Sequence, residues 1–445
     1  MTQGDGKIQI VRFAMPVLLS QIFQQLYNTA DALIVGRYLG DDALAAVSGS
    51  GTLVFMLVSF FIGTASGACV VISHFFGARD RDGVSSAIHT FITLAIMSGI
   101  LLTIIGVTLT PTLLRWMNTA ESVLPKAVSY FRWYFAGIIA NSLYNACNGI
   151  MNALGDSRHP LYYLIVSSLT NIALDLLFIA CFGWGVWAAA LATVLSQTLS
   201  TVLCLIRLSG QDAYSPVRIN RLGFDRSMLR RILQNGLPSG IQNSVIAFAN
   251  VIVQTNINSF GATAMAGYGA YSKIEGFGFL PITSFTMAIT TFVGQNLGAG
   301  ERDRAKHGAR FGIITAMILA EFIGIIIWFA APRLIGLFTE TQAVIDTGVT
   351  QCRTICLFYC LLAFSHAVAA VCRGAGHARV PMVIMLCCWC LLRVTYITLI
   401  LRVIHDIRMI YLAYPITWTV SSVIYLIYFL RFDWTSGIDV GDDRR

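Results

Sequence analysis

Long apolar runs without a charged side chain alternate along this chain with short polar connections. A membrane-spanning helix needs about 20 mainly apolar residues. Seven stretches contain no Asp, Glu, Lys or Arg, at residues 43–78, 83–114, 133–155, 176–206, 232–272, 276–300 and 409–430. If single charges within a span are tolerated, the pattern predicts twelve spans, near residues 10–37, 52–76, 86–109, 127–151, 161–182, 187–206, 238–259, 270–296, 308–330, 347–372, 380–402 and 409–431.

The composition agrees with a protein that lies in a bilayer. Hydrophobic residues make up 56% of the chain and charged residues 12%, and the mean hydropathy is +0.71. These values leave too few polar side chains to cover a soluble globule of this size. Because backbone groups in hydrocarbon must satisfy their own hydrogen bonds, the spans are expected to be helices. The sequence therefore predicts an all-α polytopic membrane protein.

The two halves of the chain repeat one another at an offset of 221 residues. The shared landmarks include Gly40 with Gly261, Gly77 with Gly298, Pro111 with Pro332, Gly155 with Gly376, and Pro160 with Pro381. Six spans per repeat is an even number, so both repeats start on the same side and a pseudo-two-fold along the membrane normal relates them. We expect an amino lobe at 1–206, a basic connecting loop at 207–237, and a carboxyl lobe with a short tail at 238–445, around a central cavity suited to alternating access.

Basic residues in the short loops predict the orientation. The connecting loop carries six arginines, Arg207, Arg218, Arg221, Arg226, Arg230 and Arg231. Counting spans by twos from this loop places both termini in the cytoplasm. The net charge of +8 is accounted for by this topology, so no nucleic-acid partner is expected. The chain opens on a polar stretch followed by a full-length span, which does not resemble a cleavable signal peptide. We expect a multi-pass protein of the plasma (inner) membrane that acts as a monomer.

Several classes of chemistry find no support in the sequence. The eleven cysteines are an odd number and lie almost entirely in apolar segments, where Cys behaves as a small hydrophobe. Clusters such as Cys352, Cys356 and Cys360 lack a matching His or carboxylate, which favours packing over a metal site. No nucleophile constellation and no phosphate-binding loop occurs. We expect neither an enzyme nor a cofactor.

Polar residues inside the spans are the informative feature, because a charge in the bilayer is costly and persists for a reason. In the first span, Gln21, Gln24, Asn28 and Asp31 form a stripe on one face. In the fifth, Asn171 and Asp175 are four residues apart, and Ala189 and Thr193 follow at the same spacing in the sixth. Two carboxylates with an amide, a hydroxyl and a backbone carbonyl suit either a Na⁺ ion or a buried acid pair that holds a proton.

The duplication supplies an internal control for these residues. At the same offset, Asp31 corresponds to Ile252, Asn171 to Leu392, Asp175 to Tyr396 and Thr193 to Tyr414. The polar set is therefore absent from the second repeat. A need of the shared fold should be met in both copies, so the set favours a function over a structural pin between the first and fifth helices, although one group could serve both.

The same residues carry a family resemblance. Residues 28–31 (Asn-Thr-Ala-Asp) leading to Leu39-Gly40 and residues 43–46 (Ala-Leu-Ala-Ala), together with residues 294–300 (Gly-Gln-Asn-Leu-Gly-Ala-Gly), resemble multidrug and toxic compound extrusion (MATE) transporters over essentially the whole chain. The resemblance implies two six-helix lobes and export of organic cations driven by inward H⁺ or Na⁺. It further implies that Asp31, Asn171, Asp175, Thr193 and the carbonyl of Ala189 form the amino-lobe cation site of the bacterial DinF-like branch.

The second repeat departs from one pattern of that family. NorM-like members carry acids in the seventh and tenth helices, where this chain has only amides such as Gln242 and Asn250 in the seventh and no acid in the tenth. Lys273 and Glu275 near the end of the eighth helix are candidates for substrate contact or gating, or for a structural pair. Glu321 and Arg393 are candidates to neutralise one another, which the sequence leaves open.

Candidate residues for the substrate cavity come from both repeats. Flat cationic ligands favour aromatic walls, although interfacial belts and helix packing use the same side chains. The candidates are Gln24, Asn28, Tyr130, Tyr134, Gln242, Asn250, Lys273, Glu275 and Phe279.

The expected function is secondary active efflux of organic, cationic amphipathic compounds in exchange for H⁺ or Na⁺. A flippase or exporter of lipid-linked saccharides is the alternative, and extra basic residues in the cavity would favour it. A membrane-embedded enzyme or receptor would need a metal or nucleophile constellation.

Overall fold

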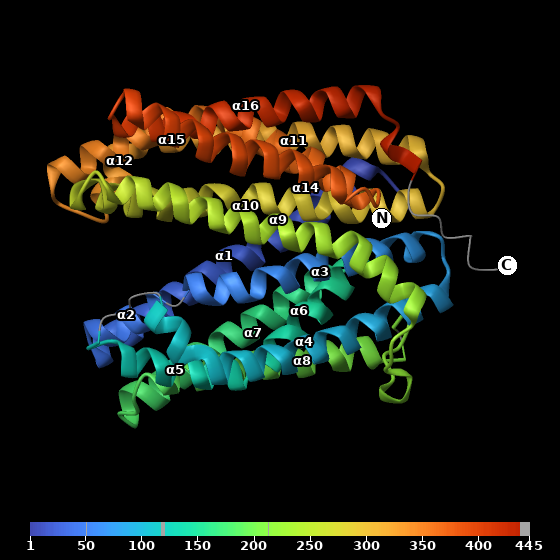
Figure 1. Cartoon of the computed structure of the whole chain (residues 1–445). Helices are drawn as coiled ribbons and strands as arrows, with labels where there is room; N and C mark the ends of the chain where they lie inside the picture. The colour runs from blue at the N-terminus through green and yellow to red at the C-terminus, as the bar shows by residue number, and fades with distance from the viewer. Residues whose placement is uncertain (50, 117–120, 212, 437–445) are drawn as a thin grey trace. The chain divides into compact units, whose positions relative to one another are not determined.

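The computed structural model describes residues 1–49, 51–116, 121–211 and 213–436, which form helices and no strands. The first repeat is drawn in blue to green in Figure 1. Its α-helices are α1 (Gly6–Leu39), α2 (Asp41–Gly49), α3 (Gly51–Gly77), α4 (Arg81–Trp116), α5 (Leu124–Ala136), α6 (Ile138–Ala153), α7 (Arg158–Asp175) and α8 (Trp187–Ser209). A π-helical segment, η1 (Leu176–Cys181), continues α7, and a short 3-10 turn, η2 (Ile219–Arg221), lies in the connecting segment.

The second repeat runs from yellow-green to red in Figure 1. Its helices are α9 (Arg226–Asn258), α10 (Ala262–Gly298), α11 (Arg302–Gly336), α12 (Gln342–Ile355), α13 (Tyr359–Gly374), α14 (Arg379–Met385), α15 (Arg393–Val403) and α16 (Ile407–Arg431). The 3-10 turn η3 (Cys356–Phe358) joins α12 to α13, the π-helical η4 (Leu386–Leu392) joins α14 to α15, and η5 (Trp434–Ser436) follows α16.

Every predicted span coincides with a helix or with a helix that is broken once. In the described residues, nine helical stretches are long and apolar enough to cross a membrane. The predicted span 127–151 is interrupted at Gly137, between α5 and α6, and the span 347–372 is interrupted at η3. Position 137 corresponds to position 358 at the repeat offset, so the same helix is broken in both copies. The all-α, membrane-spanning class is confirmed.

Left-handed backbone conformations recur at corresponding positions of the two repeats. Left-handed φ angles occur at Gly40 (82°) and Gly261 (94°), and at Gly155 (88°) and Gly376 (84°). A third pair is Arg79 (57°) with Gly300 (77°). A side chain disfavours this region and glycine does not, which explains why glycine occupies five of these six positions. The turns between helices are therefore shared by the two repeats.

The chain forms two compact units, whose boundaries do not coincide with the two repeats because the first part of α1 and the first part of α9 each belong to the other repeat's unit. One, the first-repeat unit, comprises Leu19–Gly236; the other, the second-repeat unit, comprises Met1–Leu18 and the chain from Leu237 onward. The beginning of α1 thus packs with the second repeat, and the beginning of α9 with the first. Pro16 and Pro238 lie inside these helices next to the changeover, and a proline within a helix removes a backbone hydrogen bond and favours a bend.

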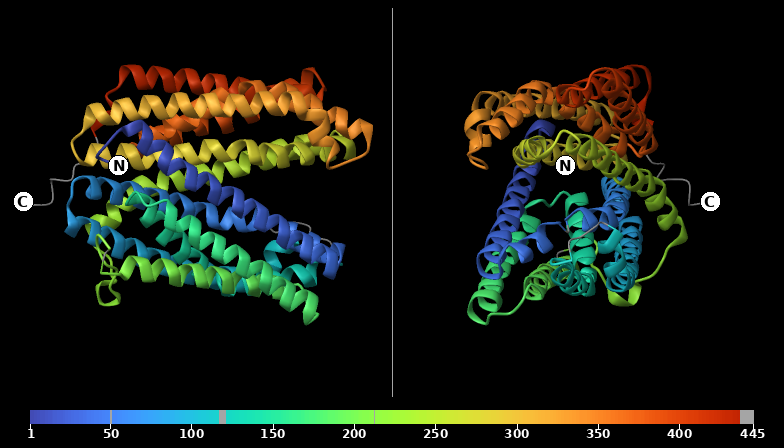
Figure 2. Two further views of the ribbon diagram at one scale, coloured as in Figure 1. Left: turned by 180° about the vertical axis from the view of Figure 1, so that it is seen from behind. Right: turned by 60° about the vertical axis from the view of Figure 1, so that its left-hand side comes forward.

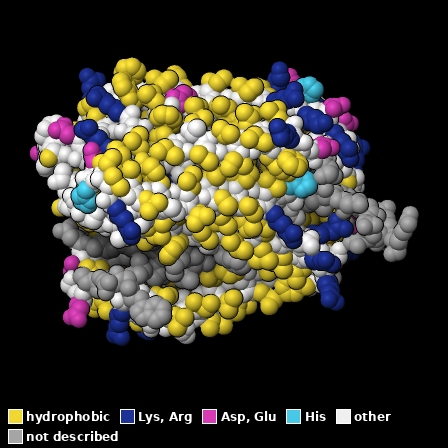
Figure 3. All heavy atoms as spheres, turned by 45° about the horizontal axis from the view of Figure 1, so that its top comes forward, with side chains coloured by type: hydrophobic (Ala, Val, Ile, Leu, Met, Phe, Trp, Pro, Cys, Tyr) yellow, Lys and Arg dark blue, Asp and Glu magenta, His cyan; other side chains and the backbone are white. Residues whose placement is uncertain are grey.

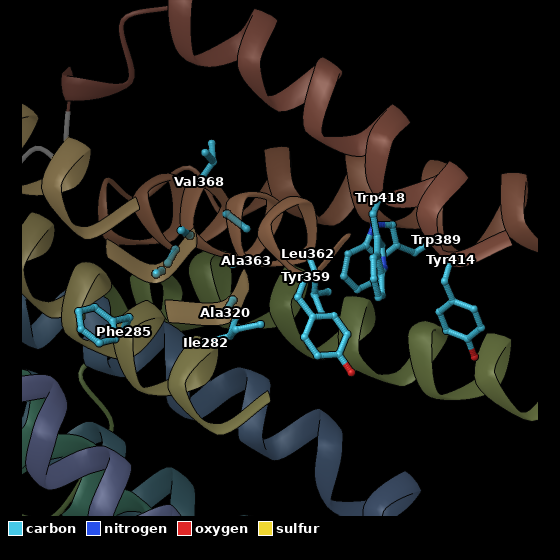
Figure 4. Packing of buried hydrophobic residues seen from close by; sticks show 14 of the residues in the cluster. Ile282, Phe285, Ala320, Tyr359, Leu362, Ala363, Val368, Trp389, Tyr414 and Trp418 are labelled. Carbon is cyan, nitrogen blue, oxygen red and sulfur yellow. The ribbon is translucent and has the colours of Figure 1, made fainter. Parts of the chain in front are cut away.

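Close helix approach holds each unit together. In the first-repeat unit, a Cβ placed on Gly67 of α3 would lie 2.3 Å from the backbone nitrogen of Gly236 in α9, so this crossing requires small residues. In the second-repeat unit, α10 and α11 run side by side (Figures 1 and 2). The hydrophobic core of the second-repeat unit includes Phe285, Tyr359 and Trp418 (Figure 4). All eleven cysteines are free thiols.

Charged side chains gather toward the ends of the helices. Hydrophobic side chains cover the middle of the face in Figure 3, and Lys and Arg side chains lie toward its edges. This distribution is the one expected of a protein whose helices cross hydrocarbon and end in polar interfaces.

The connecting segment is docked on the first-repeat unit. His89 Nε2 of α4 accepts a hydrogen bond from the backbone of Arg218 at 3.0 Å, and the ring of Tyr214 meets Phe76 edge-on with centroids 4.8 Å apart. Ser86 donates to Asp225 at 2.7 Å, and the other carboxylate oxygen of Asp225 caps the start of α9.

Candidate functional site

Two acidic side chains are buried together inside the first-repeat unit. Asp31 is contributed by α1 and is 9% exposed, whereas Asp175 ends α7 and is fully buried. The two carboxyl groups interact with each other. We call them the acid pair. The structure thus brings together the two acids that the sequence singled out from helices far apart in the chain.

The amide, hydroxyl and carbonyl predicted for this site line up beside Asp175. Asn171 lies one turn before Asp175 on α7, and its amide nitrogen donates to Thr193 Oγ1 of α8 at 3.4 Å. Thr193 in turn donates to the carbonyl of Ala189 at 3.0 Å. With the amide turned over, its nitrogen donates to Asp175 Oδ2 at 3.2 Å and its oxygen accepts from the Thr193 backbone at 3.3 Å. Either orientation ties α7 to α8 at the acid pair.

Each acid keeps one oxygen that has no hydrogen-bond partner within the described part of the chain. These atoms are Oδ1 of Asp31 and Oδ1 of Asp175, both shielded from solvent. Buried polar atoms are nearly always paired, and an exception calls for an explanation. Proton binding or coordination of a small cation would satisfy both oxygens, and oxygen atoms are the ligands that hard cations prefer. Among the described residues, no group of three or more His, Cys, Asp or Glu side chains could hold a metal, so a transition-metal centre is not indicated.

Two tyrosines, Tyr27 and Tyr130, interact with the acid pair. Tyr130 is buried and interacts electrostatically with both acids. Its ring stacks on that of Tyr134, with ring centroids 6.2 Å apart. Tyr27 interacts with the same two acids. Sequence reasoning named Tyr130 and Tyr134 as cavity residues but missed Tyr27, although its position one turn before Asp31 on α1 was a usable signal.

The backbone at Asp175 is unusual. The π-helical segment η1 begins at the next residue and ends at Cys181, before Gly183 with a φ of 67°. π-helical turns within α-helices are rare and are frequent at functional sites. Here the wider turn directly follows the acid that the sequence placed at the centre of the site.

The remaining candidates of the first-repeat unit are placed differently. Gln24 and Asn28 of α1 are exposed. Tyr134 accepts a hydrogen bond from Asn141 at 3.1 Å. Asn141 also borders a small pocket that the sequence did not predict, lined among others by Phe61, Thr64, Phe91, Ser98 and Asn145.

The candidates from the second repeat occupy several environments of the second-repeat unit. Gln242 is buried and donates to the sulfur of Met385 at 2.7 Å. Asn250 and Lys273 are exposed, and Glu275 is half-buried. Phe279 packs edge-on against His366, with ring centroids 5.0 Å apart. These residues do not form one cluster within their unit.

Glu321 and Arg393 do not neutralise one another. Glu321 Oε2 accepts from the backbone nitrogen of Cys360 at 2.9 Å, in the first turn of α13, where backbone donors have no partner within the helix. Arg393 donates from Nη2 to Thr417 Oγ1 at 3.1 Å. Each side chain therefore has a separate local role.

Comparison with known proteins agrees with this architecture. The model of the MatE family matches residues 16–177 and again residues 238–399, one match per repeat. A probable multidrug resistance protein of Bacillus subtilis, YoeA, is 30% identical over 86% of this chain and 85% of its own length. A second from the same organism, YpnP, is 29% identical over 89% of each chain.

A solved structure shows the same fold. An outward-facing multidrug resistance MATE family transporter of the MOP superfamily superposes with a TM-score of 0.90 at 24% identity, over 97% of this chain and 96% of that one. Members of this family are membrane transporters that need no cofactor and are not enzymes. The double family match and the relatives over most of the length lead to one conclusion: this chain belongs to the MatE family of multi-pass membrane transporters.

Proposed function

We propose that this transporter is a secondary active antiporter that exports organic, cationic amphipathic compounds in exchange for H⁺ or Na⁺. The observation that carries the proposal is the acid pair, Asp31 with Asp175, in which each carboxyl group keeps one buried oxygen without a partner among the described residues. Such a site gains most from a bound cation, which would leave and return as the cycle proceeds.

The energetics of the acid pair suit a coupling site. Two ionised carboxylates this close repel one another in a medium of low dielectric, so the pair favours a shared proton or a bound Na⁺. Thr193, Asn171 and the Ala189 carbonyl add neutral ligands on the same side. Because Asp31 lies on α1 and the other groups lie on α7 and α8, occupancy of the site changes how strongly α1 is held. Ion binding would then select among conformations of α1 and so act on the exported compound.

Three features support a cationic substrate and an inner-membrane location. Two relatives are named as probable multidrug resistance proteins, and the acid pair with Tyr27 and Tyr130 attracts positive charge. The arginines of the connecting segment favour a cytoplasmic position for that segment and for both termini. The working unit is proposed to be a monomer with no nucleic-acid partner.

The proposal is tested by dye accumulation in inverted membrane vesicles energised separately by a proton gradient and by a sodium gradient. A cationic fluorescent dye should accumulate under at least one gradient and collapse when that gradient is dissipated. Vesicles with Asp175→Asn, which keeps the shape and removes the charge, should show no gradient-driven accumulation. Equal accumulation by wild type and by vesicles that lack the protein would contradict the function.

A further inference from the structure

The second-repeat unit holds a buried cation that the acid pair does not explain. Arg393 is 2% exposed, and a guanidinium keeps its charge in proteins. Its Cζ lies 4.5 Å from the ring centroid of Tyr414 and 5.5 Å from that of Trp389, two side chains that Figure 4 shows on neighbouring helices. Among the described residues no carboxylate lies within 4.0 Å of it, and its Nε has no hydrogen-bond partner.

Glu275 of α10 is the acid that balances this charge at longer range. It is half-buried, accepts a hydrogen bond from Tyr271 at 3.0 Å, and interacts electrostatically with Arg393. The other titratable groups around it are Tyr268, Cys356, Tyr359 and Tyr414. Lys273, two residues away, is exposed. We call Glu275 and Arg393 with these neighbours the Glu275–Arg393 centre.

The cationic side of the centre lies close to the counterpart of the first-repeat site, whereas Glu275 corresponds to Val54, outside that site. Tyr414, which covers the guanidinium, corresponds to Thr193, and Arg393 corresponds to Ile172, the residue after Asn171. A π-helical segment adjoins the charged residue in both units, because η4 ends immediately before Arg393 as η1 begins immediately after Asp175. The second repeat thus has a positive charge one position after the counterpart of Asn171.

A structural ion pair would be built differently. Buried ion pairs are stabilising only with close contact and satisfied hydrogen bonds, whereas here the two charges are more than 4.0 Å apart and one guanidinium nitrogen has no partner among the described residues. The arrangement leaves the charge balance dependent on a single proton. With Glu275 ionised the two charges of the centre cancel, and with Glu275 protonated the centre contains an uncompensated buried cation.

We propose that Glu275 is a proton-binding site of the second-repeat unit, and that Arg393 makes it selective for protons over Na⁺. The role of Glu275 in the transport cycle rests on the antiport function proposed above, whereas its ability to bind a proton does not. A metal cation at Glu275 would be repelled by the fixed guanidinium charge and would find only one carboxylate as an anionic ligand, whereas a proton adds to the carboxylate and leaves a neutral acid. Protonation then favours conformations in which Arg393 meets water or an anionic group, which couples the site to the cycle.

Infrared difference spectroscopy of purified protein in lipid nanodiscs tests the proposal without any transport measurement. Spectra recorded between acid and alkaline pH should contain a protonated-carboxyl signal that Glu275→Gln loses and Asp175→Asn retains. The matched control is Glu321→Gln, which alters a half-buried carboxyl of the same unit that is tied to the Cys360 backbone, and this variant should keep the signal. A protonated-carboxyl signal that only Asp175→Asn loses belongs to the acid pair of the proposed function and is no evidence for Glu275. The proposed function and the Glu275 proposal can therefore fail separately.

Sodium and the arginine supply two further readouts. Replacing K⁺ by Na⁺ at constant ionic strength should leave the Glu275 signal unchanged. Arg393→Gln should move the midpoint of the Glu275 titration to higher pH by on the order of one pH unit, because a favourable positive charge is removed. Arg393→Lys keeps the charge and should move the midpoint far less. It also serves as the second variant if Arg393→Gln does not fold. A Glu275→Gln spectrum identical to wild type, or suppression of the signal by Na⁺, would overturn the proposal.

Discussion

The two repeats use one backbone plan for two kinds of charged centre. In the first-repeat unit, Asp31 and Asp175 interact with each other, and Asn171 and Thr193 lie beside Asp175. In the second-repeat unit, Glu275 and Arg393 carry opposite charges more than 4.0 Å apart, with aromatic rings around them. The helix breaks and the left-handed turns are common to both units, so the fold does not require either centre.

This contrast supports the proposal that the two units bind different coupling ions. An acid pair tolerates a proton or Na⁺, because two negative groups attract any small cation. A carboxylate held beside a fixed guanidinium accommodates a proton and disfavours a metal ion. Changes to the first-repeat unit should therefore affect coupling to either ion, and changes to the second-repeat unit should affect protons alone.

The largest effect is expected for Asp175→Asn. This substitution removes the fully buried charge and keeps the shape, so export driven by either gradient should fall to background while insertion and folding persist. Tyr396→Phe changes the corresponding residue of the second repeat and should leave export unaffected. Dye accumulation in inverted vesicles measures both variants. Gradient-driven accumulation at the wild-type rate in Asp175→Asn would remove the acid pair from the mechanism.

A partial effect is expected for Glu275→Gln. Export driven by a proton gradient should slow several-fold, because one proton site is lost while the acid pair remains. Any export driven by a sodium gradient should be unchanged. The same vesicles energised in turn by the two gradients give the comparison, and an equal loss under both gradients would show that the two centres are not specialised.

A smaller effect is expected for Thr193→Val, which keeps the volume and removes one neutral ligand. A single hydrogen bond contributes about 0.5–1.5 kcal/mol, so the apparent affinity for the coupling ion should weaken by about tenfold at most. Thr201→Val is the control on the same helix, since Thr201 donates to the carbonyls of Ala140 and Gln197 away from the acids. An identical change in ion affinity for the two variants would argue that the effect is general to α8.

The smallest effect concerns the shared turns. Gly300 has a φ of 77°, and no described atom lies within 4 Å of the position that a Cβ would take there, so Gly300→Ala adds backbone strain without a clash and should cost about 1 kcal/mol of stability. Arg79→Gly at the corresponding turn relieves the strain of a φ of 57° and should not lower the thermal transition. Thermal unfolding in detergent measures both. A lower transition for Arg79→Gly than for Gly300→Ala would contradict the equivalence of the turns.

The sequence was sufficient for the helices and for the duplication. Apolar runs, glycines and prolines report backbone environment directly, which is why the spans and the duplication could be predicted. The breaks at Gly137 and at η3 could not, because both lie inside continuous apolar segments and a change of backbone geometry leaves no polar signal there.

The sites were only partly accessible from sequence. Asp31 and Asp175 stood out because acids are rare in spans, and their absence from the second repeat distinguished them from structural residues. Tyr27 was missed because a tyrosine in a membrane helix fits packing and interfacial belts equally well. The partners of Arg393 depend on how α15 packs against α16 and on the π-helical segment before it, and neither is encoded in residue spacing.

The most direct test of the account is equilibrium binding of a fluorescent organic cation to the purified protein across pH and Na⁺ concentration, for wild type and for Asp31→Asn. Wild-type affinity should fall as the coupling ion occupies the acid pair, with linkage of the order of 5-fold to 150-fold, as is typical of coupled sites. In Asp31→Asn the Na⁺ dependence should disappear, and any remaining pH dependence should be removed by adding Glu275→Gln. If Asp31→Asn keeps the full pH and Na⁺ dependence of wild type, Asp31 only pins α1 in place and the coupling site lies elsewhere.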